Sequence, residues 1–317
     1  MPASEPLDCL IVGAGPAGLV AATYLARFRR RIALVDAGNS RARWIPTSHN
    51  CPGFPLGVSG ERLLERLAAQ AAAFGVEAEQ ARVARITRAG DGFAADTDDD
   101  RQWRARCVIL ATGIVDRMPG TGDVAAPWEA AIDAGALRLC AVCDAYEASD
   151  ERIAVYAPVD DAIRHAAFLR TFSRQVDAVR SVDGEAGAEC VALARAAGVD
   201  VLPVPQALAC TPDGCTMSFA DGGTRAYDVV YPVLGGVAQS QLATALGARC
   251  DEDGNLVTDR HQQTSVDGLY AIGDVVSALN QIAVGVGHAA IAATAVHNRL
   301  PRNFREDRAS QPPDTPL

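Results

Sequence analysis

The chain has 317 residues, of which 49% are hydrophobic and 21% charged, so the composition predicts a globular protein with a large core. Its formal net charge of -10 at pH 7 argues against nucleic-acid binding, which usually requires a basic surface. The first residues lack the positively charged start of a signal peptide, and no stretch predicts a transmembrane helix. We therefore expect a cytoplasmic protein with no nucleic-acid or membrane partner.

The first 36 residues predict a strand, a tight turn, a helix and a second strand. An apolar run at 7–12 ends in a glycine turn, a helical pattern covers 19–30, and a strand at 32–35 ends in an acid. In dinucleotide-binding folds such glycines let a pyrophosphate approach the backbone at a helix N-terminus, and the acid accepts from a ribose hydroxyl. The pattern predicts cofactor contacts at Gly13, Gly15, Pro16, Ala17, Gly18, Asp36 and Ala37.

The rest of the chain alternates between strand and helix patterns. A helix is predicted at 60–74, and a small antiparallel sheet over 81–109. A second βαβ unit follows Gly120, with strands at 152–156, 176–182 and 199–204, helices at 160–172 and 189–197, and a hairpin with a return strand over 207–234. The chain then returns to the first unit through 268–275 and a helix at 282–300.

Nine cysteines are present, and two pairs stand out. Cys140 and Cys143 are separated by two residues, a spacing that can close and reopen a small disulfide. Asp144 follows them and could protonate a leaving thiolate. Half of a zinc site and two inert buried cysteines are the alternatives, although no further CxxC or HxxxH supplies zinc ligands. Cys210 and Cys215 flank a turn sequence, which predicts a hairpin with incidental cysteines.

Several segments resemble motifs of the flavoproteins that contain two dinucleotide-binding domains. Residues 108–113 resemble their second FAD-side motif, and 269–275 resemble the C-terminal motif whose Asp binds the ribityl chain of FAD. Residues 50–53 resemble the flavin-edge loop, and 280–282 match the polar pair that enters the last helix. With the CxxC-Asp motif placed before a second βαβ unit, the chain resembles the low-molecular-weight thioredoxin reductases up to about Leu300.

The resemblance implies an FAD-dependent thiol–disulfide oxidoreductase. In that family the dithiol meets the flavin, electrons pass from NADPH through FAD to the dithiol and then to thioredoxin, and the protein is a homodimer. The resemblance implies catalytic roles for Cys140, Cys143 and Asp144, and no metal. It implies further FAD contacts at His49, Asn50, Val83, Ala111, Thr112, Gly113, Gly273, Asp274, Asn280, Gln281 and Ile282.

The predicted fold class is α/β, with two nested Rossmann-like dinucleotide-binding domains of three-layer ββα type, the second inserted in the first. Residues 1–117 and 244–317 would form a discontinuous FAD-binding domain with a flexible tail at 301–317. Residues 118–243 would form an inserted NAD(P)H-domain-like module that carries the CxxC motif.

The second βαβ unit departs from the family where its own glycine turn should lie. Residues 157–161 contain no glycine, and Val159 stands where a backbone would have to approach a pyrophosphate. Asp160 and Asp161 place negative charge where a phosphate would bind. Residues 176–183 have one Arg between two acids where the family is Arg-rich. We expect a retained fold that has lost NADPH; weak NADPH binding through an altered loop is the alternative.

Loss of NADPH requires a different electron donor or acceptor. One hypothesis is a ferredoxin donor, as in the pyridine-nucleotide-independent thioredoxin reductases. An acidic chain suits an acidic donor only if it has a local basic patch, for which the candidates are Arg164, Arg170, Arg174 and Arg180. A second hypothesis is an oxygen-dependent, disulfide-forming dithiol oxidase, since this chain resembles the dithiol oxidases of natural-product pathways. A third is a non-catalytic flavin-binding or sensing module.

Overall fold

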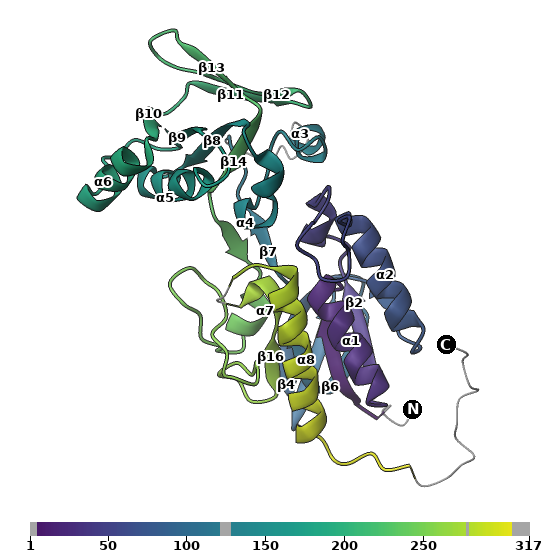
Figure 1. The fold of residues 1–317 in the computed structure, drawn as a ribbon. Coiled ribbons are helices and arrows are strands. Elements are labelled where there is room, and N and C mark those ends of the chain that lie inside the picture. The colour runs from purple at the N-terminus through teal and green to yellow at the C-terminus, as the bar shows by residue number, and fades with distance from the viewer. Residues whose placement is uncertain (1–4, 121–127, 277–278, 306–317) are drawn as a thin grey trace.

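The computed structural model describes residues 5–120, 128–276 and 279–305, and it contains two α/β units joined by a narrow connection (Figure 1). The larger unit contains both ends of the described chain, and the smaller one is formed by the middle of the chain. This arrangement confirms the predicted α/β class with two Rossmann-like units, the second inserted in the first. Among the described residues, no helix is both long and apolar enough to cross a membrane.

The larger unit is built on a seven-stranded sheet with the order β3-β2-β1-β6-β5-β4, in which β16 also pairs with β6. Val12, at the end of β1, pairs with Val35 of β2 and Leu110 of β6, so these parallel strands end at one edge. The strands are β1 (Leu7–Val12), β2 (Ile32–Asp36), β3 (Ala78–Gln80), β4 (Val83–Ala89), β5 (Gly92–Thr97), β6 (Gln102–Leu110) and β16 (Leu269–Ala271).

Alternate residues of β1 are buried on opposite faces of this sheet, as expected for a central parallel strand. Cys9 and Ile11 pack in the core beneath three helices, α1 (Pro16–Arg27), α2 (Gly60–Ala72) and α8 (Ile282–Arg299). Leu10 and Val12 pack in a second core with residues of β4 and of the segment between α7 (Gln241–Thr244) and β16. Both faces of the sheet are therefore covered.

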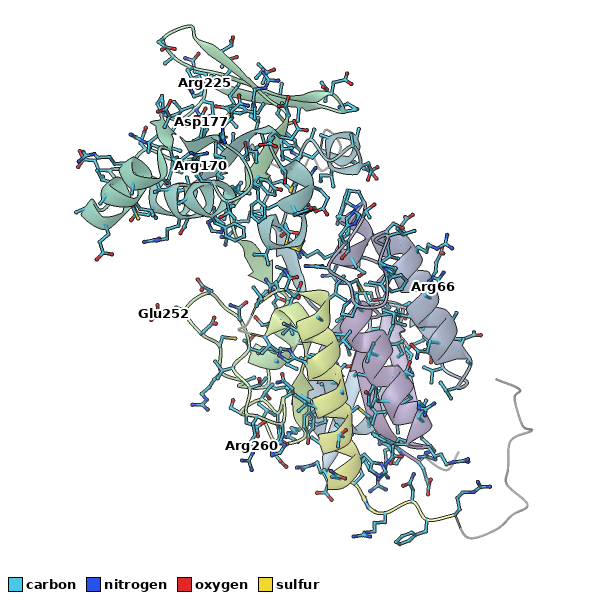
Figure 2. The ribbon with its side chains drawn as sticks, in the orientation of Figure 1. Arg66, Arg170, Asp177, Arg225, Glu252 and Arg260 are labelled. Atoms are coloured by element: carbon cyan, nitrogen blue, oxygen red, sulfur yellow. A yellow bond between two sulfur atoms is a disulfide. The ribbon has the colours of Figure 1, made fainter. Side chains whose placement is uncertain are left out.

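The smaller unit has three layers. Its parallel sheet has the order β10-β9-β8-β14, with helices α5 (Val159–Leu169) and α6 (Ala188–Ala197) on one face. An antiparallel sheet, β11-β12-β13, covers the other face. Asp177 of β9 connects the two sheets, since it accepts hydrogen bonds from Arg225 and Tyr227 of β13 at 2.8 Å each. Asp177 and Arg225 are labelled in Figure 2. The strands are β8 (Arg152–Ala157), β9 (Gln175–Arg180), β10 (Asp200–Leu202), β11 (Ala207–Thr211), β12 (Gly214–Ser218), β13 (Thr224–Tyr227) and β14 (Val229–Pro232).

Two short antiparallel strands, β7 (Ile114–Asp116) and β15 (Gly236–Ala238), form the connection between the units. Between β7 and β8 the chain forms the short helices α3 (Glu129–Asp133), α4 (Ala141–Asp144) and η2 (Tyr146–Ala148). The turn η1 (Arg41–Trp44) follows β2, and η3 (Gly273–Val275) follows β16.

Some predicted boundaries differ from the structure. Helix α1 begins at Pro16 rather than Leu19, because Gly15 is the N-cap and proline is well suited to the first helical position. Helix α5 ends at Leu169, three residues earlier than predicted. At the C-terminus, Arg30 donates to the carbonyl oxygen of Pro301 and Asn303 donates to that of Phe28. The remainder of the predicted flexible tail, 306–317, lies outside the described residues.

The interpretation of Cys210 and Cys215 as incidental cysteines is wrong. The predicted hairpin is present as β11 and β12, and the two cysteines lie directly opposite each other in its register. They form a disulfide, with their Cα atoms 4.1 Å apart. The register of the hairpin makes this pairing possible, and the prediction of a turn alone did not include that register.

Candidate active site

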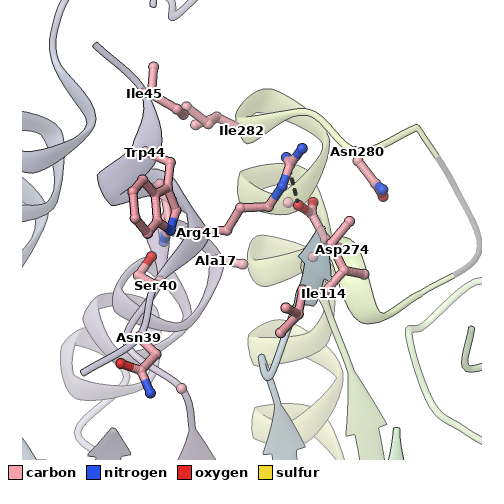
Figure 3. A pocket seen from close by; sticks show the side chains of 18 of the residues that line it. Ala17, Asn39, Ser40, Arg41, Trp44, Ile45, Ile114, Asp274, Asn280 and Ile282 are labelled. Carbon is pink, nitrogen blue, oxygen red and sulfur yellow. Dashed lines mark ion pairs between the residues drawn. The ribbon is translucent and has the colours of Figure 1, made fainter. Parts of the chain in front are cut away.

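A cavity of about 1140 Å³ extends from the glycine turn after β1 to the Cys140–Cys143 disulfide. Part of it is shown in Figure 3, where Asn39, Ser40 and Trp44 lie on one side and Asp274, Asn280 and Ile282 on the other. Every site residue predicted from the sequence lines this cavity except Gly18. The structure therefore brings together segments that are more than 250 residues apart in the sequence.

The glycine turn fits tightly against the end of β6. Gly13 has a φ of +104°, and a Cβ there would overlap the carbonyl oxygen of Ala111. A Cβ on Gly18 would overlap the carbonyl oxygen of Gly13, which explains why Gly18 is required although it does not line the cavity. Gly15, the N-cap of α1, has no side chain to cap the first turn, so the N–H groups there can serve a phosphate group.

Asp36 holds the turn and the end of β2 together. Its Oδ1 accepts a hydrogen bond from the backbone N–H of Ala14 at 2.8 Å, and its Oδ2 accepts from that of Gly38 at 2.8 Å. The carboxylate also lines the cavity, where its remaining lone pairs can accept from a ribose hydroxyl. The glycines, the open helix N-terminus and this acid fit the pyrophosphate and ribose of a dinucleotide.

Arg41 is a site residue that the sequence analysis missed. Its Nε and Nη2 donate to Asp116 at 2.6 and 3.0 Å, and its Nη1 lies 3.6 Å from Asp274 (Figure 3). Burial raises the pKa of the Asp274 carboxyl, and the Arg41 charge opposes that rise. Because Asp116 belongs to β7, Arg41 links the cavity to the connection between the units. No short motif predicts this pairing, because the partners are 75 and 233 residues away in the sequence.

The Cys140–Cys143 disulfide lies at the other end of the cavity, with its Cα atoms 5.3 Å apart. The side-chain Nε2 of Gln281 lies 3.3 Å from Cys143 Sγ and 3.5 Å from Cys140 Sγ. Gln281 Oε1 in turn accepts from Asn50 Nδ2 at 2.9 Å. Gln281 and Asn50, predicted only as cofactor contacts, therefore connect the larger unit to the disulfide of the smaller one.

Asp144 has the protonation behaviour expected of a general acid. Burial raises its pKa to about 6, while Arg138 and a hydrogen bond from Tyr231 oppose that rise. Tyr231 Oη donates to Asp144 Oδ1 at 2.9 Å. A carboxyl with this pKa can release and take up a proton near neutral pH.

Another contact between the two units was missed by the sequence analysis: His49 Nδ1 lies 3.9 Å from Glu147 Oε1.

The corresponding turn of the smaller unit has a different geometry. Pro158 is the N-cap of α5, and Asp160 lies in its first turn. Asp160 Oδ1 accepts from the backbone N–H of Gly187, the N-cap of α6, at 3.0 Å. Arg164 lies 3.9 Å from Asp160 and 3.3 Å from Asp161. A carboxylate side chain therefore bridges the starts of the two helices.

Comparison with known families identifies the fold. Residues 7–294 match the family described as pyridine nucleotide-disulphide oxidoreductase. The chain belongs to this family. A thioredoxin reductase of Peptoclostridium acidaminophilum is 26% identical over 318 residues, covering 94% of this chain and 98% of the relative.

Two solved structures align over most of the chain. A thioredoxin reductase from Streptococcus pyogenes has a TM-score of 0.83 at 28% identity, over 92% of this chain and 97% of that one. HlmI has a TM-score of 0.84 at 29% identity, over 94% of this chain and 93% of that one. The predicted resemblance to thioredoxin reductases is confirmed: the chain is an FAD-dependent disulfide oxidoreductase, and its dinucleotide cavity fits FAD.

Proposed function

We propose that this enzyme exchanges electrons between the Cys140–Cys143 dithiol and FAD and does not use NADPH. The observation that carries the proposal is the carboxylate of Asp160, which lies in the first turn of α5 and accepts from the N–H of Gly187 at the start of α6. A nucleotide-binding turn would hold a phosphate at this end of α5, and the negative charge of the carboxylate repels a phosphate there. We infer that residues 118–243 form the inserted module and that residues 1–117 and 244–317 form the FAD-binding domain.

FAD, when bound, supplies the two-electron exchange with the dithiol. We assign its pyrophosphate to the turn containing Gly13, Gly15 and Gly18, and its ribose to Asp36. The ribityl chain is assigned to Asp274, held by Arg41. We propose further contacts from Pro16, Ala17, Ala37, His49, Asn50, Val83, Ala111, Thr112, Gly113, Gly273, Asn280, Gln281 and Ile282. Asp144 protonates the thiolate that leaves when the disulfide opens, or removes the proton when it closes.

A ferredoxin donor is poorly supported by the basic residues of the smaller unit. Arg164 is paired with Asp160 and Asp161. Arg170, labelled in Figure 2, donates to the backbone carbonyl oxygens of Ala197 and Ser173. Two of the four candidate guanidinium groups are therefore engaged within the unit, which weakens their attraction for an acidic protein.

A second candidate function, an oxygen-dependent dithiol oxidase, agrees with the same bridge, because molecular oxygen needs no dinucleotide groove. Its substrate would be a small dithiol, whereas a thioredoxin-like protein partner is supported by the relatives named thioredoxin reductase. Oxygen consumption with dithiothreitol separates the two, since only the oxidase consumes oxygen stoichiometrically with the dithiol. We propose a homodimer for either function, which sedimentation analysis tests.

Single cysteine variants test the role of the dithiol. Cys140→Ser and Cys143→Ser should each retain FAD and lose thiol–disulfide turnover, because neither can form the intramolecular disulfide. Cys250→Ser is the matched control, since Cys250 is a partly exposed free thiol outside the cavity. Turnover that survives in Cys143→Ser, measured with dithiothreitol and a disulfide substrate, would exclude the proposed active site.

A further inference from the structure

The side-chain amide of Gln281, in the larger unit, lies within hydrogen-bonding distance of both sulfurs of the Cys140–Cys143 pair. Its Nε2 lies 3.3 Å from Cys143 Sγ and 3.5 Å from Cys140 Sγ, within donor distance of both. Gln281 is the N-cap residue of α8, and its own side chain makes no capping hydrogen bond. The side chain is therefore directed at the disulfide rather than at its own helix.

A relay of side chains fixes the orientation of this amide. Asn50 Nδ2 donates to Gln281 Oε1 at 2.9 Å, and Ser48 Oγ donates to Asn50 Oδ1 at 3.1 Å. Ser48 is buried, and its backbone exchanges two hydrogen bonds with Val58, at 2.7 and 3.0 Å. Because the Gln281 oxygen is occupied by a donor, the N–H groups of its amide are the ones that face the sulfurs.

Opening the disulfide strengthens the hydrogen bond from the Gln281 amide to the sulfur. Two electrons and one proton, from the flavin or from a substrate dithiol, break the S–S bond and leave one thiol and one thiolate. The neutral disulfide sulfur is a weak acceptor, whereas a thiolate is a charged one. Hydrogen bonds to charged groups are about twice as strong as those between neutral groups. An N–H donor held at this distance therefore favours the reduced, anionic state.

We propose that Gln281 is a catalytic residue that stabilises the thiolate of the reduced Cys140/Cys143 pair, and that Asn50 is the residue that positions it. The proposal rests on the proposed function of the dithiol and adds the group that sets the acidity of its thiols. Both roles are additional to the FAD contacts proposed for Gln281 and Asn50.

Other charged groups lie around the same sulfurs. Those that line the cavity beside the disulfide are Asp144 of α4, Glu147 of η2, His49 of the loop before α2, and Arg138 before α4. Ionised Asp144 and Glu147 disfavour a thiolate, whereas Arg138 and protonated His49 favour it. The Gln281 amide is neutral at every pH, so its contribution does not depend on pH.

Thiol titration tests the proposal without relying on turnover. In Cys140→Ser the Cys143 thiol remains, and in Cys143→Ser the Cys140 thiol remains. The rate of iodoacetamide alkylation of that cysteine, followed by peptide mass spectrometry across pH in the FAD-loaded protein, gives its pKa. Adding Gln281→Leu should raise this pKa by about one unit, which slows alkylation about tenfold below the pKa. Gln206→Leu, an exposed glutamine elsewhere, should leave it unchanged.

Asn50→Asp provides a second test with a distinct signature. A carboxylate cannot donate to Gln281 Oε1 but can accept from Nε2, so the amide would turn and present its oxygen to the sulfur. The thiol pKa should then rise more than in Gln281→Leu. In the otherwise wild-type enzyme, the glutathione equilibrium should shift about tenfold toward the disulfide in Gln281→Leu.

An unchanged pKa of both thiols in Gln281→Leu and in Asn50→Asp would overturn the proposal. This failure is distinguishable from failure of the proposed function, because the cysteine variants would still lose turnover. Flavin absorbance of each variant is recorded first. If Gln281→Leu loses FAD, the glutathione equilibrium of Asn50→Asp decides: a shift toward the disulfide supports the proposal, and no shift overturns it.

Discussion

The two units of this enzyme begin in the same way and differ at the turn after their first strand. The larger unit has Gly13 and Gly15 in this turn and Gly18 in the first turn of its helix, and no side chain caps the N–H groups that follow Pro16. In the smaller unit the turn has Pro158 and Val159, and Asp160 fills the space with its own carboxylate. The comparison supports the proposal that the smaller unit keeps its βαβ scaffold without a nucleotide, because the side chain of Asp160 supplies a polar contact at this end of the helix.

The largest effect should come from adding one methyl group to the turn of the larger unit. In Gly18→Ala the new Cβ would overlap the carbonyl oxygen of Gly13, so the turn must move. We expect loss of bound FAD and a decrease in the free energy of unfolding of about 3 kcal/mol. Flavin absorbance and denaturant unfolding measure the two effects.

Gly287→Ala is the matched control, because a Cβ at this helical glycine meets nothing within 4 Å. It should retain FAD and gain up to about 1 kcal/mol, since alanine is a better helix former than glycine. If Gly18→Ala keeps FAD, the larger unit does not depend on a tight glycine turn and the contrast between the units fails.

Asp144→Asn tests the chemistry of the dithiol without changing the turn that follows the first strand of either unit. It should retain FAD but lower turnover about 10²-fold, because proton transfer by a positioned acid contributes about this much. In the wild type, the step in which a substrate dithiol opens the Cys140–Cys143 disulfide should slow as pH rises through about 6, because the protonated carboxyl that it needs is lost. The reverse step, in which the pair closes as it reduces a disulfide substrate, should speed up over the same range. If the change in rate near pH 6 persists in Asp144→Asn, it is caused by another group.

The same pKa has a consequence for stability. The folded-state pKa of Asp144 lies above its ordinary value of 3.8, so the folded state binds more protons between pH 4 and about 6. The free energy of unfolding of the wild type should therefore fall relative to Asp144→Asn as pH rises through this window. Denaturant unfolding at pH 4.5 and 7 measures the difference.

The smallest effect should come from the turn of the smaller unit. Asp160→Ala removes the hydrogen bond to Gly187 and should lower the free energy of unfolding by about 1 kcal/mol. It should also strengthen binding of NADPH, because a negative charge leaves the N-terminus of α5. Asp161→Ala is the control, since its carboxylate is paired with Arg164 on an exposed face. Equal effects of the two variants would show that the bridge has no special role.

Local patterns in the sequence predicted much of the site. The strand Leu7–Val12 and the acid at the end of the next strand, Asp36, were predicted from local patterns. Hydrophobic runs and glycine turns can be recognised within a few consecutive residues. Asp274, far from Asp36 in the sequence, was predicted through a family motif, and the cavity brings the two residues together.

Contacts between distant segments could not be predicted in this way. Arg41 is one arginine among many in the sequence, and its importance depends on Asp116 and Asp274 arriving beside it through the fold. The contact of Gln281 with the disulfide requires the smaller unit to lie against the start of α8. The Cys210–Cys215 disulfide was missed because a turn sequence alone does not fix the strand register.

Anaerobic mixing of the enzyme with reductants tests the central claim most directly. Flavin absorbance is followed after addition of one equivalent of NADPH and, in parallel, of dithiothreitol. We predict that dithiothreitol bleaches the flavin through the Cys140/Cys143 pair and that NADPH leaves the absorbance unchanged on the same timescale. Fast bleaching by stoichiometric NADPH would show that the enzyme binds and uses the nucleotide, and would contradict the proposed function.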